Sequence, residues 1–176
     1  DPSGSVLPEK RSEFSAMLKQ FSKRPVAIAI STFPGEEEYL DDAFREVGYQ
    51  PVIVPRHAER RAEVAEALDG NVILRSQFQQ PLGNESFVID STGELRDWTA
   101  HADVAVIGKS FFEEGGQNPS EAILAEVPVI CGPNMSNFEP LVAELKEAGG
   151  ICMVSSREEL VSTLRKIPMG QVQRAR

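Results

Sequence analysis

The fold class of this chain is indicated by residues 25–55, which read PVAIAISTFPGEEEYLDDAFREVGYQPVIVP. The runs at 25–30 and 51–54 are short, apolar and β-branched, which is typical of strands buried on both faces of a parallel sheet. Between them, residues 36–47 carry apolar side chains at helical spacing, and Gly48 follows as a stop signal. This strand–helix–strand order predicts a right-handed βαβ unit.

The same alternation continues through the rest of the chain. Further apolar runs predict strands at 71–74, 87–90, 103–107, 127–131 and 151–154. Helical patterns are expected at 8–22, 58–68, 94–102, 119–125, 138–148 and 158–167, and a loop without a helix at 75–85. The sequence therefore predicts an α/β fold with a Rossmann-like, doubly wound parallel sheet. Residues 1–22 are interpreted as a flexible lead-in (1–7) and an N-terminal helix, and residues 23–176 as one nucleotide-binding domain.

Composition excludes several classes of protein. The chain has 176 residues, 41% of them hydrophobic, which suits one domain with a packed core. Its net charge of −9 argues against broad nucleic-acid binding, although it leaves room for a local anion site. Cys131 and Cys152 lie in apolar runs, so both are expected to be buried free thiols in a reducing compartment. His57 and His101 match no metal spacing, and no cofactor or metal is expected. The absence of a long apolar run or a signal-peptide pattern predicts a soluble fragment.

Ligands of open α/β sheets bind beyond the carboxyl ends of the strands. The segments that follow the predicted strands are rich in Gly, Ser, Thr and Asn: 31–36, 55–57, 91–94, 108–121 and 132–134. Together they predict a cradle for a phosphorylated ligand. No G-x-G-x-x-G, phosphate-binding P-loop, C-x-x-C, H-E-x-x-H or Ser/His/Asp set is present.

Two motifs predict helix starts that also suit a ligand. Residues 91–94 (STGE) have the form of a capping box, in which Ser91 caps the amide of Glu94 and Glu94 reaches back; alternatively, Gly93 lets a phosphate approach the helix amides. In residues 115–121 (GGQNPSE), capping accounts for Asn118, Pro119 and Glu121. Capping does not account for the preceding glycines, and a carboxylate at that position suits ribose hydroxyls.

Two other segments have equally open interpretations. After the second strand, Arg56 is either solvated, as Arg60 and Arg61 would be, or stacks on a base or binds a phosphate. His57 is interpreted as structural. Residues 31–37 (STFPGEE) predict a helix cap whose acidic residues favour the helix dipole.

Six motifs in order resemble one family: S-T-x-x-G-E-E, P-R-H-x-E-R, D-x-x-G-E-L, A-D-V-A-x-x-G-x-S, G-G-x-N-P-x-E and P-V-I-x-G-P-x-M-x-N-F. They occupy residues 31–37, 55–60, 90–95, 102–110, 115–121 and 128–138. Over about residues 26–150, their order and spacing are similar to the C-terminal half of 3-deoxy-D-manno-octulosonic acid (Kdo) transferases.

The resemblance implies half of a two-domain GT-B glycosyltransferase, which moves Kdo from CMP-Kdo to a lipid A precursor at the cytoplasmic face of the bacterial inner membrane. It implies that Pro55 and Arg56 meet the cytosine and phosphate, and that the amides of Thr92, Gly93 and Glu94 meet the CMP phosphate. The ribose would be held by Asn118, Pro119, Ser120 and Glu121. Further candidates for the donor site are Ser31, Thr32, Gly35, Glu36, Ser91 and Gly116.

The chain departs from the family pattern at Phe33, Thr92 and Gln117, where the family often has His, Met and His. The resemblance also implies that the general base is a glutamate of an N-terminal half, so this chain is expected to be an excised donor-binding domain without transferase activity. The reaction of the whole enzyme would be metal-independent and inverting. Two alternatives stay open: the donor half of a UDP-sugar glycosyltransferase or epimerase, and a non-catalytic nucleotide-binding or interaction module.

Overall fold

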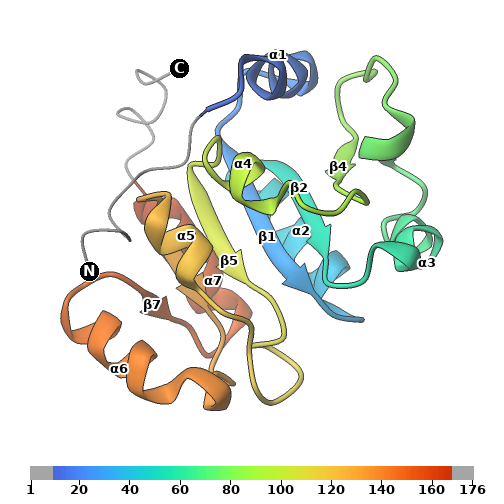
Figure 1. Ribbon diagram of the computed structural model, residues 1–176. Coiled ribbons are helices and arrows are strands. Elements are labelled where there is room, and N and C mark those ends of the chain that lie inside the picture. The colour runs from blue at the N-terminus through green and yellow to red at the C-terminus, as the bar shows by residue number, and fades with distance from the viewer. Residues whose placement is uncertain (1–9, 168–176) are drawn as a thin grey trace.

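The computed structural model describes residues 10–167, and the predicted lead-in at 1–7 lies outside this range. A seven-stranded sheet forms the centre of the fold, with strand order β3-β4-β2-β1-β5-β6-β7 and every pair parallel (Figure 1). The strands are β1 (Val26–Thr32), β2 (Gln50–Pro55), β3 (Val72–Leu74), β4 (Ser86–Val88), β5 (Val104–Ile107), β6 (Val129–Cys131) and β7 (Cys152–Met153). The predicted doubly wound parallel sheet is confirmed.

Helices cover both faces of this sheet (Figure 1). On one face lie α1 (Ser12–Phe21), α4 (Leu95–Thr99), α5 (Ser120–Leu124) and α6 (Glu139–Glu147). On the other lie α2 (Glu36–Val47), α3 (Arg61–Ala67) and α7 (Arg157–Lys166). Short 3₁₀ turns occur as η2 (Ala58–Arg60), η3 (Arg75–Gln77) and η4 (Ser136–Phe138).

The central strand β1 shows why its sequence is apolar throughout. Ile28 and Ile30 face the core beneath α1 and α4, whereas Ala27 and Ala29 face α2. All four side chains are buried, because a parallel sheet with helices on both sides leaves no exposed face. The small alanines allow α2 to pack close to the sheet.

Each predicted helix is present, with ends shifted by a few residues. The helix predicted at 8–22 spans Ser12–Phe21, and the segment 75–85 contains only the short η3 turn. Helix α1 is anchored to the sheet domain because Phe14 stacks on Trp98 of α4, with ring centroids 3.7 Å apart. Its apolar face is therefore part of the same core as the sheet.

The prediction for the two cysteines is half right. Cys131 is buried, and burial raises the pKa of its thiol to about 12. Cys152 is exposed, because β7 is a two-residue strand at the sheet edge and no further strand of the 10–167 region covers it. Both are free thiols.

Candidate functional site

The chain changes direction across the sheet between β1 and β5. The strands that follow them, β2 and β6, lie on opposite sides of this pair, so the two loops diverge at the carboxyl edge. Such a switch point is where open α/β sheets bind ligands. Here Ser31, at the irregularity near the end of β1, has a left-handed backbone with φ 57°, and Lys109, in the loop after β5, has φ 52°.

Close packing between these loops accounts for Gly108. A Cβ at this position would lie 2.3 Å from the carbonyl oxygen of Ser31, which is too short for any side chain. The backbone N–H of Gly108 donates to the carbonyl of Ile30 at 2.7 Å, which continues the contact between the two strands. The glycine is therefore required by packing, apart from any ligand.

Glu36, a candidate donor-site residue, instead organises the β5 loop. Its carboxylate is buried and accepts hydrogen bonds from the backbone N–H of Lys109 (2.8 Å), Ser110 (3.1 Å) and Phe111 (3.2 Å), and from that of Phe33 (2.9 Å). Burial raises the pKa of the Glu36 carboxyl, and these hydrogen bonds oppose the shift. Since both carboxylate oxygens of Glu36 accept hydrogen bonds from backbone N–H groups, Glu36 stabilises the conformation of the loop after β5.

A second layer of loop packing accounts for two more glycines of the expected cradle. A Cβ on Gly132 would lie 2.3 Å from the carbonyl oxygen of Ser110, and one on Gly116 would lie 2.3 Å from the sulfur of Met135. The Ser110 hydroxyl also accepts a hydrogen bond from the Gly132 N–H at 2.8 Å. The absence of a side chain at Gly116 and Gly132 thus allows the loops after β5 and β6 to pack against each other.

The arginines after β2 differ sharply in their surroundings. Arg60 binds the buried carboxylate of Glu37 at 2.8 Å, which raises the pKa of its guanidinium, and Arg61 binds Asp90 at 2.8 Å. The alternative of a solvated charge therefore does not hold for Arg60, whose side chain is 13% exposed, whereas Arg61 pairs with Asp90 and is still 44% exposed. Arg56 is exposed, and its guanidinium forms no ion pair within residues 10–167.

The capping box predicted at 91–94 does not form. Helix α4 begins at Leu95 with Glu94 as its cap residue, and no side chain caps it. The Ser91 hydroxyl instead donates to the Glu94 carboxylate, which also binds Arg75 and the Trp98 indole N–H at 3.2 Å each. Gly93 has a left-handed backbone (φ 81°), which turns the chain just before the helix. As a result, the Ser91 hydroxyl does not cap the first turn of α4.

The amides of this turn remain available. Thr92 and Gly93 are exposed, and the backbone N–H groups of Thr92, Gly93 and Glu94 have no acceptor within the described part of the chain. The Glu94 carboxyl has a lowered pKa, because the hydrogen bonds from Ser91 and Arg75 outweigh its desolvation by burial. The turn therefore presents amide donors next to a carboxylate that is already occupied.

Helix α5 begins one residue later than the sequence predicts. Ser120 is its first residue, Pro119 is the cap residue, and the Asn118 side chain accepts a hydrogen bond from the Ser120 N–H at 2.9 Å. Asn118 is therefore not the cap residue that the sequence predicts, although its side chain binds an amide of the first turn. The neighbouring Glu121 has a buried carboxylate oxygen, Oε2, with no hydrogen-bond partner among the described residues.

These segments share one edge of the sheet. The segments around Arg56, Gly93 and Glu121 follow β2, β4 and β5, whose carboxyl ends lie side by side apart from β1 between them. Helices α4 and α5, which begin after two of these segments, contact each other. Pro55 ends β2 and is buried, and Thr32 is buried with its hydroxyl donating to Glu37 at 2.6 Å.

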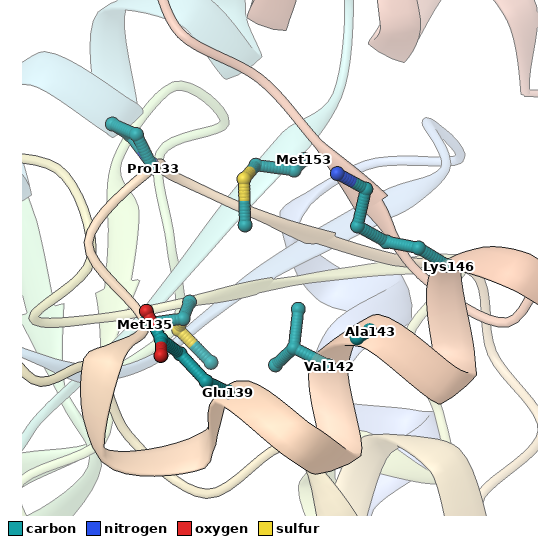
Figure 2. A pocket seen from close by; sticks show the side chains of 7 residues that line it. All are labelled: Pro133, Met135, Glu139, Val142, Ala143, Lys146 and Met153. Atoms are coloured by element: carbon teal, nitrogen blue, oxygen red, sulfur yellow. The ribbon is translucent and has the colours of Figure 1, made fainter.

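One hollow of the described structure lies away from these segments. It has a volume of about 330 Å³ between α6, the β6–η4 loop and β7, and Figure 2 shows Met135, Val142 and Met153 facing it. None of the predicted site residues lines it. The candidate site is therefore an open edge and does not coincide with this hollow.

Sequence reasoning missed Lys109. Its position after Gly108 in a strand–loop junction is visible in the sequence, but its left-handed backbone is not.

Within residues 10–167, no helix combines the length and apolarity needed to cross a bilayer.

Comparison with known proteins agrees with this geometry. No family model matches the sequence. The chain is 34% identical over 142 residues to 3-deoxy-D-manno-octulosonic acid transferase of Haemophilus influenzae, a match that covers 76% of this chain and 33% of that protein. It is 25% identical to the C-terminal CMP-Kdo binding domain of WaaA from Acinetobacter baumannii, with a TM-score of 0.77 over 92% of this chain and 93% of that one.

A more distant match supports the fold alone. WaaG, a glycosyltransferase involved in lipopolysaccharide biosynthesis, is 14% identical, with a TM-score of 0.51 over 99% of this chain and 47% of that one. The sheet with its flanking helices is thus half of a GT-B architecture. The chain spans about a third of the length of the curated relatives it matches. Motif order, fold and sequence identity together show that the chain belongs to the Kdo transferase family, as the counterpart of its C-terminal domain.

Proposed function

We propose that this chain binds CMP-Kdo as the donor domain of an inverting glycosyltransferase. The observation that carries the proposal is the buried Oε2 of Glu121, which has no partner in the described structure. A buried acceptor without a donor is costly, so such an atom is suited to a ligand hydroxyl. A ribose supplies two adjacent hydroxyl donors.

The phosphate of CMP would lie between the turn before α4 and the side chain after β2. The free amides of Thr92, Gly93 and Glu94 suit an anion, and Arg56 brings a positive charge that no carboxylate neutralises within residues 10–167. Donors of this kind stabilise a departing phosphate as negative charge develops on it. The role of Pro55 in the same proposal is to border the cytosine.

The donor sugar, the acceptor, the general base and the location of the whole enzyme are part of the same proposal. Matches to Kdo transferases over most of this chain support a Kdo donor. The acceptor would be a lipid A precursor, bound by another domain that also supplies the general base, at the cytoplasmic face of the inner membrane. The 10–167 region alone would bind the donor without transferring it.

Calorimetric titration with CMP, UMP and UDP tests the proposal. CMP should bind most tightly, and Arg56→Ala should weaken it about ten-fold, as expected for a lost charge-assisted hydrogen bond. Lys23→Ala is the matched control, because Lys23 is an exposed cation just before the amino end of β1, at the opposite edge of the sheet. Tighter binding of UDP than of CMP, or equal binding by Arg56→Ala and the wild type, would contradict the assignment.

A further inference from the structure

Lys109 adopts a backbone conformation that lysine ordinarily avoids. Its φ of 52° lies in the left-handed region, where a Cβ costs energy and glycine does not. Residues held in such a region cluster at ligand sites, where the surrounding structure maintains them. We therefore expect the side chain of Lys109 to have a function, such as ligand binding, that offsets this conformational cost.

The surrounding loops fix the backbone of Lys109 from two sides. Its N–H donates to the buried carboxylate of Glu36 at 2.8 Å, as do the N–H groups of the next two residues. The preceding residue, Gly108, is pressed against the carbonyl of Ser31. The base of the lysine side chain is thus fixed at the switch point of the sheet.

From there the side chain lies between two loops of the candidate site. Its Nζ lies 5.1 Å from the centroid of the Phe33 ring, which is a cation–π contact, and its Cε lies 3.8 Å from where a Cβ on Gly115 would be. The Gly115 loop leads directly to Asn118 and Glu121. The ammonium group is therefore held next to the segment proposed to bind ribose.

The charge of Lys109 has no counter-ion among residues 10–167. The arginines Arg60, Arg61 and Arg75 at the same edge bind Glu37, Asp90 and Glu94. By contrast, neither Lys109 nor Arg56 forms an ion pair within the described range, although Glu113 and Glu114 occur in the Lys109 loop.

Phe33 lies beside Lys109 and beside the segment that contains Arg56. Its ring meets Lys109 on one side and the ring of His57, the residue after Arg56, at 5.9 Å. The backbone N–H of Arg56 donates to the carbonyl of Thr32, the residue before Phe33. The ammonium group of Lys109 and the backbone of residues 56–57 thus lie next to the same segment, residues 32–33.

We propose that Lys109 binds the carboxylate of the donor sugar and selects ulosonic acids over sugars that lack this group. The inference rests on the proposed function, which assigns the phosphate to Arg56 and the α4 turn. A CMP-linked ulosonic acid carries its carboxylate on the same carbon that bears the phosphodiester oxygen. Two anionic groups on one ligand suit two cations at the same edge of the sheet, and Lys109 supplies the second.

The test compares two ligands that share the phosphodiester: freshly prepared CMP-Kdo and the methyl phosphodiester of CMP, which lacks a carboxylate. The wild-type chain should bind CMP-Kdo about five-fold more tightly, as expected for one partly exposed ion pair. Lys109→Gln should bind both ligands equally, and Lys109→Arg should retain the preference.

A further variant separates the binding role from a structural one. Lys109→Gly removes the side chain and also relieves the left-handed backbone, so its Tm should equal or exceed that of the wild type while the preference for CMP-Kdo is lost. A wild type that binds both ligands alike, or Lys109 variants that keep the preference, would overturn this inference alone. A Lys109→Gln variant that weakens both ligands by the same factor would also overturn it. A wild type that binds neither ligand would overturn the proposed function, and this inference with it.

Discussion

The carboxylate of Glu36 accepts a hydrogen bond from the backbone N–H of Lys109, 73 residues later in the chain, at 2.8 Å. This contact joins the first turn of α2 to the loop after β5, across the switch point of the sheet. It explains how an acidic side chain that is 1% exposed stays compatible with the core. The loops of the candidate site are consequently held in place by the protein before any ligand arrives.

Glu36→Gln should destabilise the fold by about 2 kcal/mol, because the amide group of Gln turns a donor toward backbone N–H groups that need acceptors. Urea unfolding followed by circular dichroism measures this change. Glu38→Gln is the matched control, since Glu38 is exposed on the same helical turn and should change stability by less than about 0.5 kcal/mol. Equal effects of the two substitutions would contradict a supporting role for Glu36.

Asp90 should make stability depend on pH below about 4. Burial opposes its ionisation, but hydrogen bonds from Ser76 and Arg61 outweigh this effect and lower the pKa from 3.8. A carboxyl with a lowered folded pKa binds fewer protons in the native state, so it stabilises above the ordinary pKa. This stabilisation is lost as the pH falls through the folded value.

Asp90→Asn should therefore cost about 2 kcal/mol at pH 6 and clearly less at pH 3. Urea unfolding at both pH values gives the two differences. Asp69→Asn, at an exposed position, serves as the control and should show the same small effect at both. A penalty for Asp90→Asn that does not shrink in acid would contradict the assigned pKa shift.

Glu121 should report on the ribose. If its unpartnered Oε2 accepts a ribose hydroxyl, Glu121→Gln should weaken CMP about ten-fold and affect 2′-deoxy-CMP much less. Calorimetry on the two proteins and two ligands gives the coupling between residue and hydroxyl. Glu126→Gln is the control, because Glu126 is exposed just beyond the same helix. An equal loss of affinity for both nucleotides would contradict a hydrogen bond between Glu121 and the ribose 2′-hydroxyl.

The contact between Phe14 and Trp98 tests whether α1 is part of the domain or a separable lead-in. Phe14→Ala should cost about 3 kcal/mol and move the emission of the single tryptophan to longer wavelength, because the indole loses its stacking partner. Lys19→Ala, exposed on the same helix, should change neither property. If Phe14→Ala behaves like Lys19→Ala, α1 is dispensable.

The elements of this fold follow from local sequence because their signals are strong. The apolar β1 and the helix α2, which ends at left-handed Gly48, coincide with periodicity and a stop residue. Burial at the edge strands of the sheet follows less directly from local sequence. Cys152 was expected to be buried because its neighbours are apolar, but burial at an edge strand depends on whether a further strand covers it, which no local pattern encodes.

The candidate site was predictable in location more than in detail. The rule that ligands bind beyond the carboxyl ends of strands identifies the loops that contain Arg56, Gly93 and Glu121. It could not tell that Ser91 hydrogen-bonds the Glu94 side chain instead of capping α4, since that depends on the φ of Gly93. Nor could it distinguish glycines that approach a ligand from Gly108, which approaches another loop.

The pairing of Arg60, Arg61 and Arg75 with carboxylates has a consequence for the rate at which an anion reaches this edge. With these charges cancelled, the long-range field is set by the net charge of −9, which repels a nucleotide until it is near Arg56 and Lys109. Added salt screens that repulsion over distances of about 10 Å at 0.1 M. Encounter with an anionic ligand is therefore faster at moderate salt than at low salt, although the protein binds that ligand through positive charges.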